Sequence, residues 1–424
     1  MKVCVAAPIA TADLLSRLSP AEVAAMGSAL PRGYEGAPLT AVLIGELLDQ
    51  GHQVQALTVD YKMASGSARA VLHGPGLTYH VLPGRRRAWR PNGWQLGRAL
   101  DLYRLERRMI TAELRALAPD LVHAHWTYEF ALAALDSGLP TVVTAHDAPA
   151  EVVRITRSAY RALRYLTARR VLRRARHVTT VSDYLARALA PAIGHPVDVV
   201  PNPVARHVME AGRWRASPPA RPRLGLVCNG WSAIKNPEVA LRAFALFRAQ
   251  QGGELHCFGE DFGPEQVAQR WARAAGLDEG VVFHGRQDHA AMIQALADLD
   301  GLLHTALEES FGVVIAEAMA LGLPVVAGQR TGAVPWVLGM DPSAPSTIGP
   351  GVLTEVTRAE AVAAALAVLF DDRYGERSAL GLAQARARFS PDVVAERYLQ
   401  VYRAALADPA ASDWAAPGGV HGHA

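Results

Sequence analysis

Short apolar runs alternate along the chain with longer segments in which apolar residues recur every three or four positions. The runs predict buried strands, and the segments between them predict amphipathic helices. In the first half the predicted strands are KVCVAAP, HQVQALTVD, DLVHAHW, TVVTAH, HVTTVS and VDVVPNP, with helices such as LTAVLIGELLDQG and RRMITAELRALAPD between them. Strands that alternate with helices favour right-handed crossover connections and a parallel sheet that is covered on both faces.

The same alternation begins again after the Pro- and Arg-rich segment 213–223, with strands predicted at LGLVCNG, ELHCFGE, VVFHG, DGLLHTA and LPVVAG. The chain is therefore predicted to be an α/β protein with two doubly wound, Rossmann-like domains over 1–202 and 203–390, joined by a linker near 203–222. A last helix over 391–407 is expected to pack back on the first domain, and the aperiodic tail 408–424 is expected to be disordered. Ligands of such sheets bind at the carboxyl ends of the strands, so a cleft between two facing sheets is the expected site.

The composition favours a globular protein, since half of the 424 residues are hydrophobic and 20% are charged. No uncharged apolar run reaches about 18 residues, so no membrane-spanning helix is predicted. The N-terminus MKVCVAAPIA is a weak match to a signal peptide, and we interpret it as a first strand that ends at Pro8. Cys4, Cys228 and Cys257 lie in or beside apolar runs and are interpreted as core residues of a cytoplasmic protein.

Positive charge is concentrated in the first half, where residues 1–205 contain 24 Lys and Arg against 16 Asp and Glu. The segment from Arg154 to Arg176 contains nine arginines and no acidic residue. Two interpretations of a helix there stay open: a solvated helix that covers the sheet, or a helix that lies against anionic lipid headgroups at the inner face of a membrane, as would suit a lipid-linked acceptor. No nucleic-acid partner is expected, because no aromatic platform accompanies the basic residues.

One carboxylate, Glu317, lies inside the almost unbroken apolar run ESFGVVIAEAMALGLPVVA, which begins at Glu309. Burying an unpaired carboxylate is costly, so Glu317 must be paired, protonated or facing a cleft. Glu309 follows the strand DGLLHTA, and a helix then runs from near Gly312 to a stop at Gly322. The two carboxylates are expected to lie on the order of 10 Å apart. This arrangement fits a ligand with hydroxyls at both ends and an anion held at the helix start between them.

The stretch HTALEESFGVVIAEAMALGLPVVAG resembles the Glu-x7-Glu region of the family 4 glycosyltransferases, retaining enzymes of GT-B fold that use nucleotide-sugar donors. By this resemblance, Glu317 holds the ribose hydroxyls and Glu309 contacts the donor sugar. The loop residues that the resemblance places at the diphosphate are Ser310, Phe311 and Gly312.

The segment CNGWSAIKNPEVALRAF stands where the family has a glycine, an arginine and a lysine that grip the diphosphate. Gly230 and Lys235 match the glycine and the lysine, which implies that Lys235 neutralises charge on the leaving group. The arginine is missing, and Asn236 stands where a glycine is common. The grip is therefore either weakened or completed by another residue.

In the first half, PRGYEGAPLTAVLIGELLDQGHQV resembles the family's glycine loop and first helix, which implies that Gly33 and Gly36 let the backbone approach the phosphate or sugar. TVVTAHD resembles the family's Thr-x-His-Asp segment. It implies that His146 hydrogen-bonds the transferred sugar, and that Asp147 orients groups on the acceptor side.

His125 is a further candidate on the acceptor or sugar side. His123 and His125 alternate along one strand and so share a face of the sheet, but no third ligand is evident, and no metal site is predicted. Three further positions depart from the family pattern: Ala306 replaces a common Ser, Thr331 a Gly and Trp336 a Glu.

The expected function is retaining transfer of a hexose-like unit from a nucleotide-diphosphate sugar to an acceptor, in bacterial-type glycan, polysaccharide or glycolipid biosynthesis. The expected catalytic residues are Lys235, Glu309 and His146, with no cofactor and no metal. Two alternatives stay open. One is a nucleotide-sugar epimerase of the same fold, and the other is a degenerate, non-catalytic protein that binds a nucleotide sugar.

Overall fold

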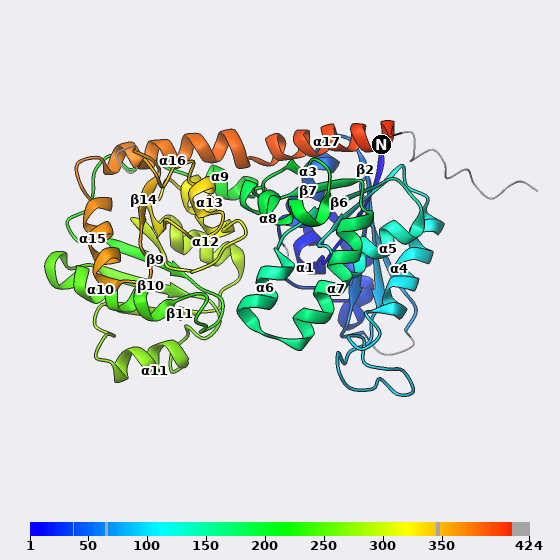
Figure 1. The fold of residues 1–424 in the computed structure, drawn as a ribbon, viewed down its shortest axis with the longest axis horizontal. Helices are drawn as coiled ribbons and strands as arrows, with labels where there is room; N and C mark the ends of the chain where they lie inside the picture. Colours follow the sequence, from blue (N-terminus) through cyan, green and yellow to red (C-terminus); the bar gives the residue numbers. More distant parts are fainter. Residues whose placement is uncertain (37, 64–66, 345–347, 409–424) are drawn as a thin grey trace, which may run out of the picture. The chain divides into compact units, whose positions relative to one another are not determined.

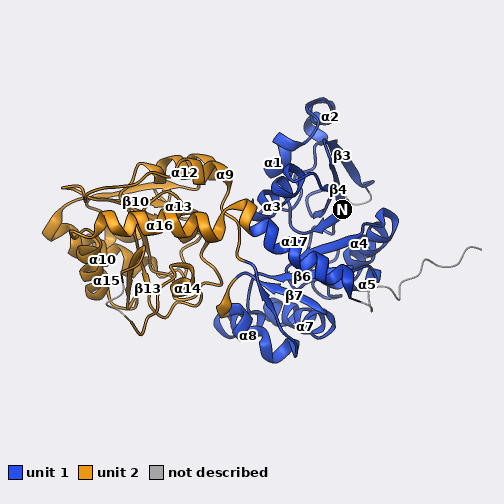
Figure 2. Cartoon of the chain, turned by 90° about the horizontal axis from the view of Figure 1, so that it is seen from above, with its two compact units in different colours: residues 1–181, 185–200, 394–424 blue, residues 182–184, 201–393 orange. Residues whose placement is uncertain are grey.

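A computed structural model describes residues 1–36, 38–63, 67–344 and 348–408 of the chain. They form two compact units, coloured blue and orange in Figure 2. The first unit contains residues 1–181, 185–200 and those from 394 on, and the second contains 182–184 and 201–393. The tail predicted at 408–424 lies outside the described residues except for Asp408.

The first unit is built on an eight-stranded sheet with the order β3-β4-β2-β1-β5-β6-β7-β8, of which β2, β6 and β7 are labelled in Figure 1. Its strands are β1 (Lys2–Ala6), β2 (Gln53–Asp60), β3 (Ala70–Gly74), β4 (Leu77–Pro83), β5 (Leu121–His125), β6 (Thr141–Ala145), β7 (His177–Thr180) and β8 (Asp198–Val199). All neighbours are parallel except β3 and β4. The sheet therefore departs from the expected parallel one at this edge, where Pro75 and Gly76, with φ of +71° at Gly76, make a hairpin turn.

Helices cover both faces of this sheet because its strands alternate. Val3 and Val5 of β1 pack in one apolar cluster with Tyr398 of α17, whereas Cys4 and Ala6 pack in another with residues of α4, α5 and α7. The helices of the unit are α1 (Thr11–Leu14), α2 (Pro20–Met26), α3 (Pro38–Asp49), α4 (Arg104–Leu117), α5 (Glu129–Ser137), α6 (Pro149–Thr156), α7 (Ala159–Arg174), α8 (Asp183–Ile193) and α17 (Pro391–Ala407), with short 3-10 turns at Leu15–Arg17 and Gly27–Ala29. The first residues of α8 and α17 belong to the second unit.

The basic segment from Arg154 to Arg176 is not a single helix. The chain leaves α6 at Arg157, which adopts a left-handed conformation with φ of +47°, and α7 begins after Ser158. Arg157 therefore lies between the two helices, and Arg164 of α7 points inward, where it pairs with Glu129.

The second unit is a six-stranded parallel sheet with the order β11-β10-β9-β12-β13-β14. Its strands are β9 (Arg223–Val227), β10 (Glu254–Phe258), β11 (Val281–Gly285), β12 (Gly301–His304), β13 (Val325–Gly328) and β14 (Gly351–Thr354). Its helices are α9 (Arg206–Glu210), α10 (Pro237–Gln251), α11 (Val267–Ala274), α12 (His289–Ala297), α13 (Val313–Ala320), α14 (Val334–Val337), α15 (Ala359–Leu369) and α16 (Tyr374–Phe389).

The order of this second sheet changes direction between β9 and β12, which lie side by side although a long segment separates them in sequence. In open α/β sheets such a switch point opens a crevice at the carboxyl ends of the strands. The loops that follow β9 and β12 are those that contain Lys235 and Glu309. Among the described residues no helix is long and apolar enough to cross a membrane.

Candidate active site

An ion pair joins the two loops at the switch point of the second unit. Lys235, which precedes α10, donates from Nζ to Glu309 Oε1 at 2.5 Å. The loops are also tied through their backbones, because the Leu307 amide donates to the Ile234 carbonyl at 2.8 Å. Both charged side chains are partly exposed, at 30% for Lys235 and 16% for Glu309. The pair is therefore accessible to a ligand at the carboxyl ends of β9 and β12.

Two further polar side chains lie close to this pair. His304, at the end of β12, is buried, and its Nε2 lies 3.6 Å from Glu309 Oε1. Burial lowers the pKa of His304, with Glu309 raising it and Lys235 lowering it further, so the imidazole is neutral near pH 7. Burial raises the pKa of the Cys228 thiol to about 11 although Lys235 acts in the opposite direction. Cys228 is therefore a protonated core residue and not a nucleophile.

The turn into α13 has the geometry of an anion site. Gly312 caps the helix in a left-handed conformation with φ of +84°. Within the described chain, no acceptor lies on the amides of Ser310, Phe311 or Gly312. The Phe311 ring is buried and packs edge-to-face against Phe389 and Trp336, which fixes the turn from behind. The packing of Phe311 therefore fixes the position of these unbonded amides, which directly follow Glu309 in the sequence.

Glu317 lies on α13 and is 5% exposed, as its apolar surroundings predicted. Its Oε1 atom has a hydrogen-bond partner that the sequence analysis missed: His289 Nε2 lies 2.7 Å from Glu317 Oε1. His289 is the first residue of α12, and its ring contacts that of His207. The carboxylate thus has one oxygen bound to an imidazole and a second oxygen to offer to a ligand.

Gly230 follows β9 and adopts a left-handed conformation with φ of +87°. A Cβ at this position would meet only Asp261 Oδ2, at 4.0 Å, so the space above Gly230 is open. Its amide, however, already donates to the Glu260 carbonyl at 3.2 Å, and the Trp231 amide donates to Asp261. Gly230 therefore offers close approach to a ligand and not a free amide.

Three histidines lie close together in the first unit, His123 and His125 in β5 and His146 just after β6. His125 Nδ1 and His146 Nε2 share a hydrogen bond of 2.9 Å, and the His146 ring packs on Trp126. His123 is bound on both sides, by Thr144 at 2.7 Å and by Tyr402 of α17 at 2.7 Å. No group of three metal-ligating side chains gathers anywhere in the described ranges.

The three imidazoles should make the first unit sensitive to acid. Burial lowers the pKa of His123 and of His146 to about 3. The unfolded chain binds protons below its ordinary histidine pKa of about 6.5, while the native state does not. Stability is therefore complete above that pH, and each imidazole is expected to remove about 1.4 kcal/mol per pH unit as the pH falls below it.

Urea unfolding between neutral and mildly acidic pH measures this loss. His123→Gln should reduce the pH slope, because it removes one of the buried imidazoles. An equal slope in the wild type and in His123→Gln would contradict the assignment of the acid sensitivity to the buried imidazoles.

A cavity of about 270 Å³ opens beside these histidines in the first unit. Asp147 lies in its wall: Tyr128 donates to Asp147 Oδ2 at 2.6 Å, and the buried Oδ1 has no partner. Burial raises the pKa of Asp147, although the hydrogen bond from Tyr128 acts against this. The cavity is lined by Pro8, Tyr34, Glu35, Gly36, Trp126, Tyr128, Glu129, Phe130, Asp147, Tyr160, Arg161 and Arg164.

The two glycines of the predicted glycine loop differ in their surroundings. Gly36 lines this cavity, and a Cβ there would meet nothing within 4 Å. Gly33 faces the interior, where a Cβ would lie 2.3 Å from the Ile9 carbonyl, and its amide donates to Asp60 at 3.1 Å. Gly36 is therefore the position at which a ligand can approach the backbone, and Gly33 shapes the loop.

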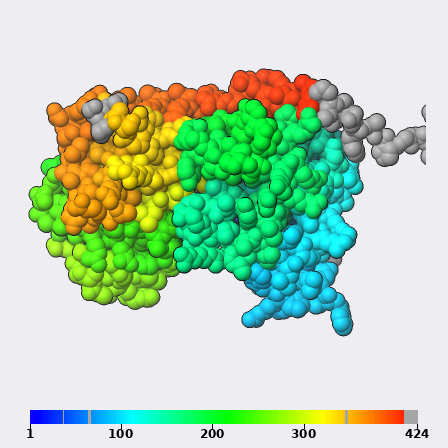
Figure 3. Space-filling view, viewed as in Figure 1, coloured from blue at the N-terminus to red at the C-terminus, as the bar shows by residue number. Residues whose placement is uncertain are grey.

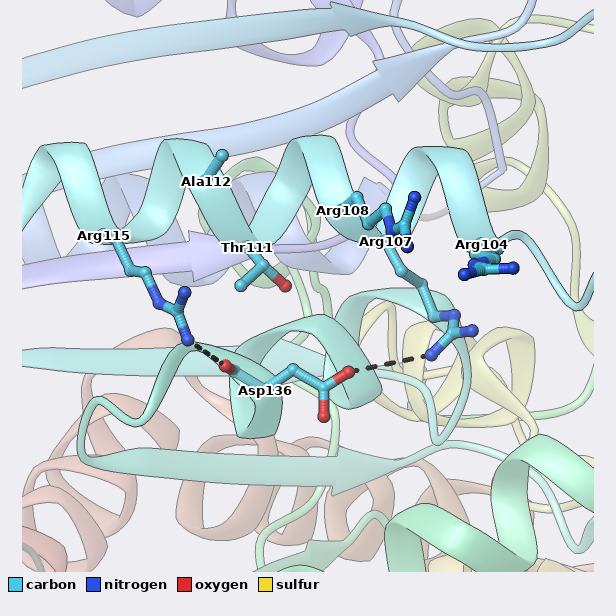
Figure 4. A pocket seen from close by; sticks show the side chains of 7 residues that line it. All are labelled: Arg104, Arg107, Arg108, Thr111, Ala112, Arg115 and Asp136. Carbon is cyan, nitrogen blue, oxygen red and sulfur yellow. Dashed lines mark hydrogen bonds and ion pairs between the residues drawn. The ribbon is translucent and has the colours of Figure 1, made fainter.

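A second hollow, of about 360 Å³, lies along α4 and is basic (Figure 4). Arg107 and Arg115 reach Asp136, the first through an ion pair of 3.7 Å and the second through the Asp136 carbonyl at 2.7 Å. Arg104 and Arg108 are exposed on the same helix. This hollow has no acid or base free for chemistry, so it is a basic surface and not a reaction centre.

Comparison with known sequences assigns the chain to a family. The profile described as Glycosyltransferase Family 4 matches residues 39–207, and the profile described as Glycosyl transferases group 1 matches residues 221–372. The chain belongs to glycosyltransferase family 4.

Two curated relatives are similar to segments of this glycosyltransferase. N-acetyl-alpha-D-glucosaminyl L-malate synthase of Bacillus anthracis is 33% identical over 106 residues, which are 25% of this chain and 26% of the relative. D-inositol 3-phosphate glycosyltransferase of Segniliparus rotundus is 32% identical over 180 residues, which are 41% of this chain and 38% of the relative. The matches thus span well under half the length of these relatives.

Solved structures share the fold of this glycosyltransferase. Sucrose-phosphate synthase from Thermosynechococcus elongatus superposes with a TM-score of 0.70 at 17% identity over 95% of this chain and 98% of that chain. Anabaena HepE in complex with UDP-glucose gives 0.62 at 16% identity over 95% and 100%. The architecture is the GT-B fold of two Rossmann-like domains, as the sequence predicted.

Proposed function

We propose that this glycosyltransferase takes a nucleotide-diphosphate sugar as donor, bound on the second unit. The observation that carries the proposal is the Lys235–Glu309 pair beside the unbonded amides at the start of α13. An ammonium and free amides suit a diphosphate, and a carboxylate suits sugar hydroxyls. HepE, which shares the fold, was solved with UDP-glucose, and this supports the same class of donor.

The proposed reaction is transfer with retention of anomeric configuration. The bond from the anomeric carbon to the diphosphate oxygen breaks, and the acceptor oxygen forms a bond to that carbon on the same face. The acceptor proton passes to the departing diphosphate, so no protein nucleophile is needed. Lys235 has three N–H donors, of which Glu309 takes one, and the others can stabilise the charge that develops on the leaving group. We propose on this ground that the reaction needs no metal.

We propose that Arg330 completes the grip in place of the family's missing arginine. Arg330 is exposed and lines a cavity of about 270 Å³ with Leu307 and Val356. Its loop is bound to the Glu309 loop, because Thr331 donates to the Ala306 carbonyl at 2.9 Å and the Ala333 amide to the Glu309 carbonyl at 2.8 Å. A guanidinium there can contact phosphate oxygens in a bidentate manner.

For the acceptor, we propose the cavity of the first unit. Its walls combine the aromatic rings of Tyr34, Trp126 and Tyr160 with the unpaired Asp147 Oδ1, a lining that suits a hydroxyl-bearing, sugar-like acceptor. Such acceptors fit glycan, polysaccharide or glycolipid synthesis in the cytoplasm. The roles of His146 and His125 toward the sugar stay predictions. Because the family's arginine is missing, a non-catalytic protein that binds a nucleotide sugar is the second candidate function. Product analysis with a donor and candidate acceptors distinguishes this candidate from a glycosyltransferase.

Glu317→Gln is expected to weaken the binding of nucleoside diphosphates by about 10- to 100-fold, because hydrogen bonds from ribose hydroxyls to a charged acceptor are stronger than those to an amide. Isothermal titration calorimetry against a panel of nucleoside diphosphates measures the loss and identifies the base. The thermal midpoint should change little, since Gln keeps the size and a hydrogen bond of the side chain.

His289→Gln is the matched control, since it removes the imidazole that holds Glu317 Oε1. If Glu317 serves only to pair with His289, both variants will lower the thermal midpoint and neither will change nucleotide affinity. That pattern, or an unchanged affinity in Glu317→Gln alone, would exclude the ribose assignment.

A further inference from the structure

The segment between β4 and α4 holds large apolar side chains out in water. Trp94 is fully exposed, and Trp89, Leu96 and Leu100 are between 45% and 59% exposed. Figures 1 and 3 show this segment, coloured light blue, standing out from the rest of its unit. Single exposed apolar residues are common, but four large ones within the short segment 89–100, two of them tryptophans, indicate an interaction surface.

Ion pairs and hydrogen bonds hold the loop 84–100 in a defined conformation. Arg85 at its base is buried and forms ion pairs with Asp101 at 2.7 Å and Glu106 at 2.6 Å. Across the loop, the Asn92 side chain accepts from the Arg87 amide at 2.8 Å and donates to the Arg87 carbonyl at 3.0 Å. The Ala99 amide donates to the Ala88 carbonyl at 2.9 Å. The exposed rings are therefore presented by an ordered support.

The positive charge of the loop favours an anionic partner. Residues 84–100 contain five arginines and no acidic residue. Arg86, Arg87 and Arg90 are exposed, close in sequence to both tryptophans. Tryptophan is enriched at the interface between lipid and water, and arginine side chains there are attracted to anionic headgroups. A protein partner would require a large acidic and apolar surface, whereas an anionic bilayer supplies both properties everywhere.

We propose that the loop 84–100 is a membrane anchor that inserts Trp94 among the headgroups of an anionic lipid surface. The loop adjoins the proposed acceptor cavity, because the Trp89 ring packs edge-to-face on Tyr160 at 6.1 Å, and Tyr160 lines that cavity. Where the proposed function holds, the anchor brings this cavity to a lipid-linked acceptor. This part of the inference rests on the proposed function, but binding to lipid does not.

Vesicle co-sedimentation without donor or acceptor tests the anchor. The full chain should bind phosphatidylcholine vesicles that contain about 30% phosphatidylglycerol, bind pure phosphatidylcholine weakly, and dissociate when salt rises from about 0.1 to 0.5 M. Trp94→Ser should lower the partition coefficient by about tenfold. Arg86→Gln with Arg90→Gln should lower it by about thirtyfold.

Two controls locate the effect. Trp214→Ser removes a tryptophan that is 62% exposed on the second unit, and it should bind vesicles as the wild type does. Arg169→Gln with Arg170→Gln removes charge from the exposed face of α7, which also bears the exposed Leu166, and it should lower binding less than the loop variants. Nucleoside diphosphate affinity and thermal midpoints should stay unchanged in all four variants.

The proposal is overturned if the wild type binds neither kind of vesicle, if Trp94→Ser binds as tightly as the wild type, or if only the α7 variant loses binding. Sedimentation velocity in the absence of lipid gives the remaining outcome: self-association that Trp94→Ser abolishes would assign the loop to a second copy of the chain. Donor turnover in solution is measured separately, so a failed anchor leaves the proposed function standing.

Discussion

Lys235→Ala is expected to lower the turnover of a nucleotide-sugar donor by about 100- to 1,000-fold, the loss typical of removing one preorganised group that stabilises a developing charge. Lys235 is one of three lysines in a chain otherwise rich in arginine. Its ammonium is compact and can hold Glu309 and a phosphate oxygen at once. The measurement is the rate of donor hydrolysis without acceptor, with the affinity for the nucleoside diphosphate measured in parallel.

Companion variants separate charge from position. Lys235→Arg keeps the charge but changes its shape, so it should retain part of the activity. Arg330→Gln should cost activity if this arginine completes the grip, whereas Arg358→Gln, at an exposed position, should not. Lys62→Ala is the matched lysine control, since Lys62 lies on the surface of the first unit beside Glu35.

Two outcomes would contradict these predictions, the first for the role of Lys235 and the second for the enzymatic activity itself. Hydrolysis that is equal in the wild type and Lys235→Ala would remove Lys235 from the chemistry. A wild type that binds nucleoside diphosphates but turns over no donor, with or without acceptor, would instead favour the non-catalytic binding protein.

The strands were predictable from the sequence because each is a short apolar run bounded by turn residues. All eleven predicted strands are present, although β8 is reduced to Asp198–Val199. The hairpin of β3 and β4 was missed because its strands are mixed in polarity, as in AVLHG, and the sequence signal for a buried parallel strand is absent there. The short β14, GVLT, was also missed, because only two of its four residues, Val352 and Leu353, are apolar.

The candidate site was predictable only where its residues are close in sequence. The interval from Glu309 to Glu317 shows in the sequence because both residues flank one helix start. The hydrogen-bond partner of Glu317 could not be predicted from the sequence, because His289 lies on another helix, 28 residues away. The ion pair of Lys235 and Glu309 joins residues 74 apart and depends on the adjacency of β9 and β12, which only the sheet order reveals.

The arginines show the same limit. The sequence gives their charge but does not predict their burial, so the segment from Arg154 to Arg176 was interpreted as one basic surface. The structure turns Arg164 inward and leaves Arg169 and Arg170 exposed. The exposure of the tryptophans in the loop 84–100 could not be predicted either, because a large aromatic residue is ordinarily expected to be mostly buried.

Glu129→Gln is expected to destabilise the first unit by about 3–5 kcal/mol, because it leaves the buried Arg164 charge without its partner. The two side chains are only 3% and 12% exposed, and Arg164 Nη1 donates to Glu129 Oε2 at 2.6 Å. The guanidinium also lies 3.9 Å from the centre of the Tyr128 ring. Burial by itself would lower the pKa of Arg164, but Glu129 and nearby tyrosines hold it above its ordinary value. Arg164 therefore stays charged in every state of the protein.

Urea unfolding, followed by circular dichroism, measures the change in midpoint. Arg164→Met should destabilise by a similar amount, since it leaves Glu129 unpaired, whereas the double variant Glu129→Gln with Arg164→Met should recover much of the loss because no buried charge remains. Glu151→Gln is the matched control: its ion pair with Arg154 is exposed on α6, and the change should stay below about 1 kcal/mol. If the double variant is no more stable than either single variant, the pair contributes through shape and cation–π packing. The cavity wall formed by these two side chains then depends on their packing and not on their charge.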